Sequence, residues 1–311
     1  MDNIAHTLSG IVIRDSTQNT LSRNKVFFVV SLFAANAPDI DIALMLGGAE
    51  TYLKYHRGFT HSIIFIPFFG IIAALLAYFF SKKQLPFLKL WFWFSLMVFV
   101  HDTMDWITSY GTQLLWPFSK TPFSANLFPI VDPILIVLMF VVVLVITFKP
   151  RTRRRVIIFF LIALSAYSAL RIHSKIASKN KVIKSFGQPE QVYSYVNTEK
   201  LVFWFNPTLY RVVTVEGDSA KSFAASAFSR EIEFQGVYDL LDEGDDFFDD
   251  IISFELSRTY VERSRLPVIK RRDDVLLLSD LRYSGNIGQA GGLVLYFPLK
   301  EGRISGEPRW F

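Results

Sequence analysis

Long apolar segments alternate with short polar or basic segments over the first 170 residues of the chain. A predominantly apolar run of about 20 residues is long enough to cross a bilayer as a helix. Five runs of this length or somewhat less predict membrane spans: Val26–Pro38, Ser62–Phe80, Leu90–Tyr110, Ile130–Phe148 and Val156–Ile172. The first and last of these are short. The run Ile4–Ile13 is shorter still and is typical of a half-buried or re-entrant helix.

The pattern changes after residue 178, where short β-branched and aromatic runs are separated by Gly and Pro. Such runs predict strands at Val192–Tyr195, Leu201–Phe205, Tyr210–Val215, Val275–Leu278 and Leu293–Phe297. The segment Val237–Val261 predicts one or two helices. Its acidic stretch lacks the spacing of a calcium-binding EF-hand loop, so we expect a solvated face there. The predicted fold class is an α-helical multi-pass membrane domain over residues 1–178, followed by a soluble α+β domain over residues 179–311.

Two strongly basic loops predict the orientation of the helices. Ser81–Lys89 and Lys149–Arg155 join apolar segments, and such loops favour the cytoplasmic side. The opposite helix ends, which carry His56–His61, His101–Tyr110 and Asp132, then face outward. We therefore expect a multi-pass protein of the inner (cytoplasmic) membrane with an extracytoplasmic C-terminal domain. No basic segment followed by an apolar run and a cleavage site opens the chain, so no removable signal peptide is expected.

Composition supports the membrane prediction and narrows the chemistry. Hydrophobic residues make up 51% of the chain, and 31 of the 311 residues are Phe. The absence of Cys excludes disulfides and thiolate metal sites, so any metal is held by His, Asp or Glu. The net charge of +5 arises beside apolar segments, so membrane lipids rather than nucleic acid are the expected partners.

Histidine and carboxylate residues recur at spacings that suit a shared site. His101 and Asp105 are four residues apart and share one face of a helix. Four of the five histidines lie within the first 101 residues. The other groups are Asp2 with His6, the Pro38–Asp41 turn with Asp39 and Asp41, and His56 with His61.

Burying these groups at membrane depth would cost several kcal/mol each unless they neutralise one another. A divalent cation does this, because it takes carboxylate oxygens and neutral imidazole nitrogens as ligands. The predicted metal ligands are His6, Asp39, His56, His61, His101 and Asp105, and the candidate catalytic residues are Asp41, Arg57 and Asp132. So many ligands suit two ions better than one, and this donor set suits Zn, with Mn or Fe as alternatives.

Several of these residues have plainer interpretations. The Asp/His pairs are compatible with simple salt-linked helix pairs. Asp132 precedes Pro133, which is also the arrangement of a helix N-cap. Arg57 suits either a clamp for phosphate or carboxylate or an anchor among lipid headgroups. His173 has no acidic neighbour and is expected to be structural.

The motifs together resemble a known family. They are Met1-Asp2 with Ala5-His6-Thr7 and Gly10, Pro38-Asp39-Ile40-Asp41, His56 to Ser62, His101 with Asp105, Tyr110-Gly111-Thr112, Pro117-Phe118-Ser119, Asp132-Pro133, Asn206-Pro207 and Asp280-Leu281-Arg282-Tyr283. This set resembles the YdjM-type family of inner-membrane metal-dependent hydrolases, named after a LexA-regulated member. The resemblance covers nearly the whole chain and implies a membrane hydrolase without specifying a substrate. Ala5 departs from the family, which commonly has Thr there.

A site at the outer bilayer interface favours a lipid or lipid-linked substrate, with phosphoester hydrolysis as the first expectation and ester or amide cleavage as the second. Two other classes are weighed against this. An ion transporter would place charges near helix centres in matched halves, whereas here they lie toward helix ends and no internal repeat is present. A structural or regulatory membrane protein would use the metal only to hold helices together, within a closed coordination shell.

Overall fold

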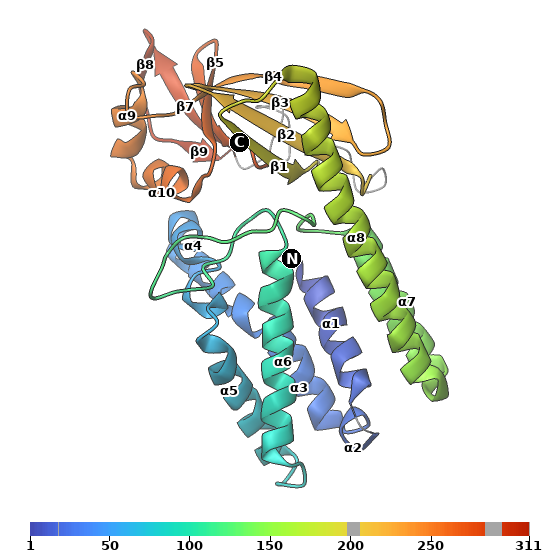
Figure 1. Cartoon of the computed structure of the whole chain (residues 1–311). Helices are drawn as coiled ribbons and strands as arrows, with labels where there is room; N and C mark the ends of the chain where they lie inside the picture. The colour runs from blue at the N-terminus through green and yellow to red at the C-terminus, as the bar shows by residue number, and fades with distance from the viewer. Residues whose placement is uncertain (18, 198–205, 284–293, 311) are drawn as a thin grey trace. The chain divides into compact units, whose positions relative to one another are not determined.

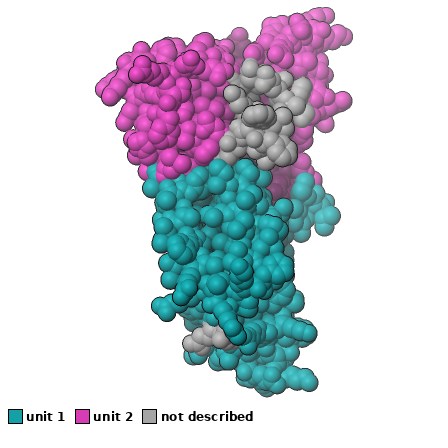
Figure 2. Space-filling view, turned by 90° about the vertical axis from the view of Figure 1, so that its right-hand side faces the viewer, with its two compact units in different colours: residues 1–46, 55–169 teal, residues 47–54, 170–311 magenta. Residues whose placement is uncertain are grey.

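The computed structural model describes residues 1–17, 19–197, 206–283 and 294–310. The chain divides into two compact units, coloured separately in Figure 2. The first unit contains residues 1–46 and 55–169, and the second contains residues 47–54 and 170–311.

The first unit is helical (Figure 1). Its α-helices are α1 (Asn3–Ser16), α2 (Asn19–Ser22), α3 (Lys25–Asn36), α5 (Phe65–Phe80), α6 (Phe87–Trp106), α7 (Pro133–Phe148) and the first part of α8 (Arg153–Phe186). Helix α4 (Ala49–Tyr55) begins in the second unit. The 3₁₀ segments are η1 (Ala37–Gly47), η2 (Phe59–His61) and η3 (Pro150–Thr152).

Two of the described helices are long and apolar enough to cross a membrane, namely 25–47 and 150–186. A third is possible if α4, η2 and α5, which are bent by 78°, count as one broken span. Helix α7 is apolar but shorter. The expected span at Leu90–Tyr110 corresponds to α6, which is not among these candidates, because Trp side chains and a polar C-terminal end lower its hydropathy. The last expected span, Val156–Ile172, underestimates α8, which continues to Phe186.

Small side chains lie between the helices of the first unit, and large apolar ones point outward. Ala73, Ala74 and Ala77 of α5 are fully buried in the cluster that includes Leu90 and Phe94 of α6. A Cβ at Gly10 would lie 2.5 Å from the Ala35 Cβ, so glycine lets α1 approach α3 closely. Exposed large apolar side chains include Phe68, Phe80, Phe92, Phe140 and Phe159. Small residues at helix contacts and large apolar residues outside are typical of helices packed in lipid.

The second unit is an antiparallel sheet with helices. Its strands are β1 (Gln191–Val196), β2 (Leu209–Glu216), β3 (Ser219–Ser226), β4 (Ile232–Leu240), β5 (Pro267–Arg272), β6 (Val275–Asp280), β7 (Val294–Lys300), β8 (Arg303–Ile304) and β9 (Arg309–Trp310). Strands β1 to β8 pair in sequence order, and β9 pairs with β7. The helices α9 (Phe248–Ser253) and α10 (Glu255–Arg263) precede β5.

The predicted helices over Val237–Val261 are correct only from residue 248 onward. Residues 237–240 belong to β4, where Asp239 pairs with Ser219 of β3, and residues 241–247 form a connection. Pairing with a neighbouring strand therefore decides the structure of residues 237–240. Strand β3 was missed because Ser219–Ser226 is rich in Ala and Ser, which carry little strand preference. The strand predicted at Leu201–Phe205 lies outside the described residues.

A buried ion pair closes the end of β6. Arg282 Nε donates to Asp280 Oδ2 at 2.7 Å, and the Arg282 backbone N–H donates to Oδ1 at 2.8 Å. The Arg265 backbone N–H donates to the same carboxylate at 2.9 Å. Burial disfavours the charged guanidinium, but the Asp280 carboxylate outweighs it and raises the pKa of Arg282 above its usual value. The motif Asp280-Leu281-Arg282-Tyr283 therefore contains a strand-end salt bridge.

Candidate metal centre

Three separate segments of the first unit supply the polar side chains of the site. Asp39 and Asp41 lie in η1, where the chain leaves α3 and Pro38 begins a tighter turn. His61 ends η2, just before α5. His101 and Asp105 lie one turn apart on α6. Because the segments are far apart in sequence, only the packing of α3, α5 and α6 brings them together.

The turn before η2 depends on two unusual backbone positions. Arg57 has a φ of 54°, in the left-handed region that few side chains adopt. A Cβ at the next residue, Gly58, would lie 2.6 Å from the Tyr55 carbonyl oxygen, so glycine is required there. Gln113 N–H holds the turn by donating to the Arg57 carbonyl at 2.9 Å. This geometry explains the Arg-Gly pair between His56 and His61.

The ligand atoms of Asp39, His61, His101 and Asp105 all lie within 4.8 Å of one another. His61 Nε2 is 3.1 Å from Asp105 Oδ2, 3.3 Å from His101 Nε2 and 3.4 Å from Asp39 Oδ1. His101 Nε2 is 3.6 Å from both carboxylates. Ligand atoms about 2.0–2.2 Å from a tetrahedral ion lie about 3.3–3.6 Å apart. The five separations that involve a histidine, 3.1–3.6 Å, are therefore close to the spacing of ligands around one small cation.

Neighbouring groups fix which nitrogen of each imidazole faces this centre. His101 Nδ1 lies 2.8 Å from the Ala35 carbonyl oxygen, which can only accept, so Nδ1 carries the proton. His61 Nδ1 lies 3.0 Å from Thr60 Oγ1, whose hydroxyl donates to Asp41 Oδ2 at 3.2 Å. Both Nε2 atoms then present lone pairs to each other and to two carboxylates. Converging lone pairs in a buried space are stabilised by a proton or a cation between them, and this set of donors fits a divalent metal.

Asp41 organises the segment that delivers His61. One of its oxygens accepts from the Arg57 backbone N–H at 2.9 Å and from Thr60 Oγ1. Its other oxygen lies 3.0 Å from His56 Nδ1. With the side chain buried, this carboxylate acts through His61 and the turn rather than in the four-residue group itself.

Replacing Asp41 with asparagine is expected to weaken metal affinity about 10–100-fold, the usual effect of losing a supporting hydrogen-bond partner of a ligand. The amide offers one accepting oxygen where the carboxylate offers two. Titration of the apoprotein with Zn²⁺ and a competing chelator measures this. The matched control is Asp132→Asn, which also alters a buried carboxylate of this unit and should leave affinity unchanged.

Asp105 Oδ2 faces His61, and the other oxygen of this carboxylate, Oδ1, contacts two cationic groups. Arg57 Nη2 lies 2.8 Å from Asp105 Oδ1, and the same oxygen is paired with the Met1 α-amino group. Arg57 Nη1 also donates to Thr108 Oγ1 at 3.1 Å, and only 3% of Arg57 is exposed. The guanidinium therefore fixes a ligand carboxylate from inside the protein.

His6 lies beside the four-residue group but not in it. Its ring stacks on His101 with centroids 3.7 Å apart, and its Nε2 is 3.4 Å from Asp105 Oδ1. Both ring nitrogens are buried and neither has a hydrogen-bond partner among the described residues. A fully buried imidazole without a hydrogen bond is rare, and His6 provides a further donor atom next to the centre.

The remaining predicted residues have other positions. His56 pairs with Asp41 and stacks edge-on against Tyr110, outside the group. Asp132 caps α7 through the Leu135 N–H at 2.9 Å and accepts from Tyr167 at 2.8 Å, which agrees with its capping interpretation. The described residues contain one group of this kind rather than two.

Asp102 of α6 is a buried carboxylate that the sequence patterns above did not predict as a site residue. It is 2% exposed, and neither carboxylate oxygen has a hydrogen-bond partner in the described part of the chain. The four-residue spacing of His101 and Asp105 predicts that these two side chains share one helix face, and Asp102 lies outside that spacing. The signal for Asp102 is simpler: it is a carboxylate that directly follows the long apolar run of α6 and His101.

Comparison with known proteins assigns the helical unit to a family. The profile of the YdjM inner membrane protein family matches residues 1–176, which include the complete centre. The chain belongs to this family. The family resemblance expected from the motifs is thereby confirmed, and inner-membrane localisation follows from family and apolar helices together.

Two curated relatives cover smaller parts. The uncharacterized protein YfhP of Bacillus subtilis (strain 168) is 38% identical over 109 residues, which is 35% of this YdjM-family chain and 33% of YfhP. The inner membrane protein YbcI of Escherichia coli (strain K12) is 28% identical over 99 residues, or 30% of this chain and 55% of YbcI. The matches thus span about a third to a half of these relatives. No solved structure matches the chain significantly.

Proposed function

We propose that this YdjM-family protein is a multi-pass, metal-dependent hydrolase that acts on a lipid or lipid-linked phosphoester at the outer face of the cytoplasmic membrane. The observation that carries the proposal is the convergence of Asp39, His61, His101 and Asp105 within 4.8 Å in a buried setting. A bound divalent cation supplies a water of lowered pKa and an electrophilic centre. The basic loops Ser81–Lys89 and Lys149–Arg155 support the orientation, with the C-terminal domain extracytoplasmic.

The residues around the centre have distinct roles in this proposal. Arg57 holds the Asp105 carboxylate in place, and its positive charge favours an anionic phosphoester nearby. His6, whose ring nitrogens make no hydrogen bond among the described residues, would take a proton from the attacking water or bind a second ion. Zn, Mn and Fe all accept this mixture of imidazole and carboxylate.

A second candidate function has its own support. Four protein donors complete a tetrahedral shell, which is the arrangement of structural rather than catalytic zinc. In this alternative the ion holds η1, η2 and α6 together and no substrate binds. A six-coordinate ion such as Mn²⁺ would instead keep open positions on the same four ligands.

Metal removal tests the proposal. The purified full chain is freed of metal with a chelator and assayed on phosphatidic acid and on a water-soluble phosphomonoester, before and after Zn²⁺ or Mn²⁺ is restored. We expect hydrolysis to disappear with the metal and to return with it. Equal turnover by the metal-free protein would overturn the catalytic role, and loss of folded protein without any turnover in the restored sample would favour the structural alternative.

A further inference from the structure

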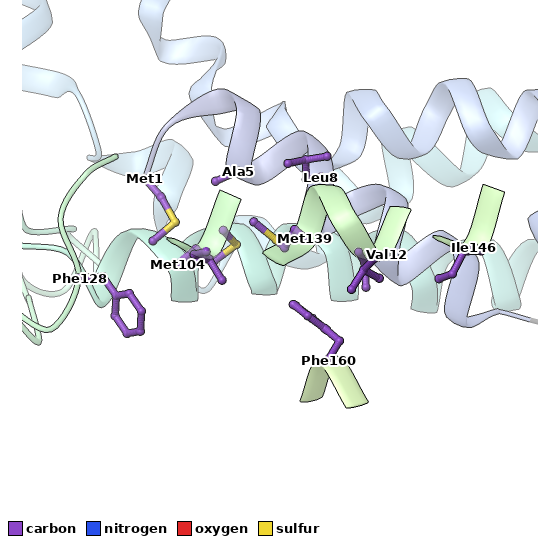
Figure 3. Close-up of a cluster of buried hydrophobic side chains, with 11 residues drawn as sticks. Met1, Ala5, Leu8, Val12, Met104, Phe128, Met139, Ile146 and Phe160 are labelled. Carbon is purple, nitrogen blue, oxygen red and sulfur yellow. The ribbon is translucent and has the colours of Figure 1, made fainter. Parts of the chain in front are cut away.

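The first unit contains a cavity of about 540 Å³ that the metal chemistry does not use. It is partly open, and it is lined by side chains of four helices, α1, α6, α7 and α8, and of the segment that follows α6. Figure 3 shows four of the lining residues, Val12, Met104, Met139 and Phe160, one from each helix. Its volume falls within the range of about 300–1,000 Å³ that is typical of ligand pockets.

The cavity offers almost no hydrogen bonds to an occupant. Fourteen of its eighteen lining residues are apolar. Three of the four hydroxyl residues donate to carbonyls of their own helix: Ser9 to His6 at 2.8 Å, Ser16 to Ile13 at 2.6 Å and Thr103 to Phe99 at 2.8 Å. A polar ligand would lose its hydration there without replacement, so the occupant must be hydrocarbon.

The cavity is elongated along the helices. On α8 its lining runs from Ile157 to Ser168, which is about 16 Å at 1.5 Å per residue. On α1 it runs from Ser9 to Ser16, about 10 Å by the same rise. This shape suits a chain lying parallel to the helices better than a compact molecule.

One end of the cavity is lined by residues that are next in sequence to two metal ligands. Val100 and Met104 line the cavity and are the immediate neighbours of His101 and Asp105 on α6. On α1, the lining residue Ser9 lies one turn after His6 and is hydrogen-bonded to its carbonyl. The lining of the cavity therefore reaches the same turns of α6 and α1 that carry His101, Asp105 and His6.

We propose that this cavity binds one hydrocarbon chain of the lipid substrate and thereby places the attached phosphoester at the metal centre. The proposal rests on the function proposed above and names the part of the substrate that gives affinity. Helix α8 is itself a candidate membrane span, so lipid chains are present at high concentration around it. The hydrocarbon chain of the lipid would move sideways from the bilayer into the cavity and keep apolar surroundings throughout.

Binding is tested without reference to turnover, because the chain contains no Cys and a single introduced thiol can be labelled selectively. Ser168→Cys places a small fluorophore in the cavity, and Ser165→Cys places it on the exposed side of the same helix. The full chain is reconstituted in phosphatidylcholine nanodiscs with increasing phosphatidic acid that carries a nitroxide on one chain. We expect quenching at residue 168 to saturate at low mole fraction, and quenching at residue 165 to rise in proportion to it.

A filling substitution supplies the matched comparison. Thr103→Phe narrows the cavity, whereas Thr147→Phe alters a threonine with the same hydrogen bond to its own helix, at 2.8 Å, on an exposed face of α7. Saturable quenching should be lost in the first variant and kept in the second. Thr103→Phe should also lower kcat/KM for phosphatidic acid at least 10-fold and leave a water-soluble phosphomonoester unaffected.

The outcomes separate the two proposals. Saturable quenching at residue 168 without hydrolysis of any substrate would support binding of a hydrocarbon chain in the cavity and refute the proposed function. Hydrolysis of phosphatidic acid, together with quenching at residues 165 and 168 that rises in proportion to the lipid, would support the proposed function and refute the hydrocarbon-chain site. If a helix of a second copy fills the cavity, quenching at residue 168 stays low at every lipid concentration, which overturns the chain site.

Discussion

Replacing His61 with alanine is expected to remove the metal from the protein and to abolish hydrolysis. His61 Nε2 touches the three other ligand atoms at 3.1–3.4 Å, so it is the central member of the group. Its loss should lower metal affinity by more than the about 10–100-fold caused by losing a supporting residue. The metal-to-protein ratio after dialysis, measured by elemental analysis, and kcat/KM on phosphatidic acid report the two effects.

The fifth histidine of the chain provides the control. His173 lies in α8 within the second unit, where its ring is 6.2 Å from that of Phe228. The His173→Ala variant should keep both the metal and the activity. A His61→Ala protein that retains a full complement of metal would refute the four-residue centre. If it loses metal and unfolds, whereas His56→Ala behaves like the parent protein, the structural alternative gains support.

Truncating Asp280 is expected to destabilise the second unit by about 3–5 kcal/mol, because it leaves the buried Arg282 guanidinium without its counter-charge. Asp280 is fully buried and Arg282 is 5% exposed. The same substitution also removes the acceptor of the Arg265 and Arg282 backbone N–H groups. Hydrogen exchange of the full chain, followed by mass spectrometry, should show faster exchange in β6 and its partner strands.

Two further variants test the cause. Asp249→Ala, at an exposed position in the first turn of α9, should leave exchange in β6 unchanged. The double variant Asp280→Leu with Arg282→Met should be more stable than Asp280→Ala, because it removes the unpaired charge as well. Equal protection of β6 in the parent and in Asp280→Ala would show that the ion pair contributes little.

Local sequence features predicted much of the helical unit, because apolar length and helix capping act over one or two turns. The run ending at Phe80 and the Asp132-Pro133 cap of α7 are examples. Strand prediction was weaker: β3 has few strand-forming residues, and residues 237–240, which were expected to be helical, belong to β4. Strands depend on partners distant in sequence, which local patterns do not contain.

The sequence by itself determined the family, the apolar helices and the pool of residues able to bind a metal. It did so because motif identity and hydropathy are properties of the chain before it folds. Only the tertiary structure decided that Asp39, His61, His101 and Asp105 form the group, that Asp41 and Arg57 support it and that Asp132 caps a helix. Those assignments depend on how α3, η2 and α6 pack, since a difference of one helical turn at any contact would present other side chains.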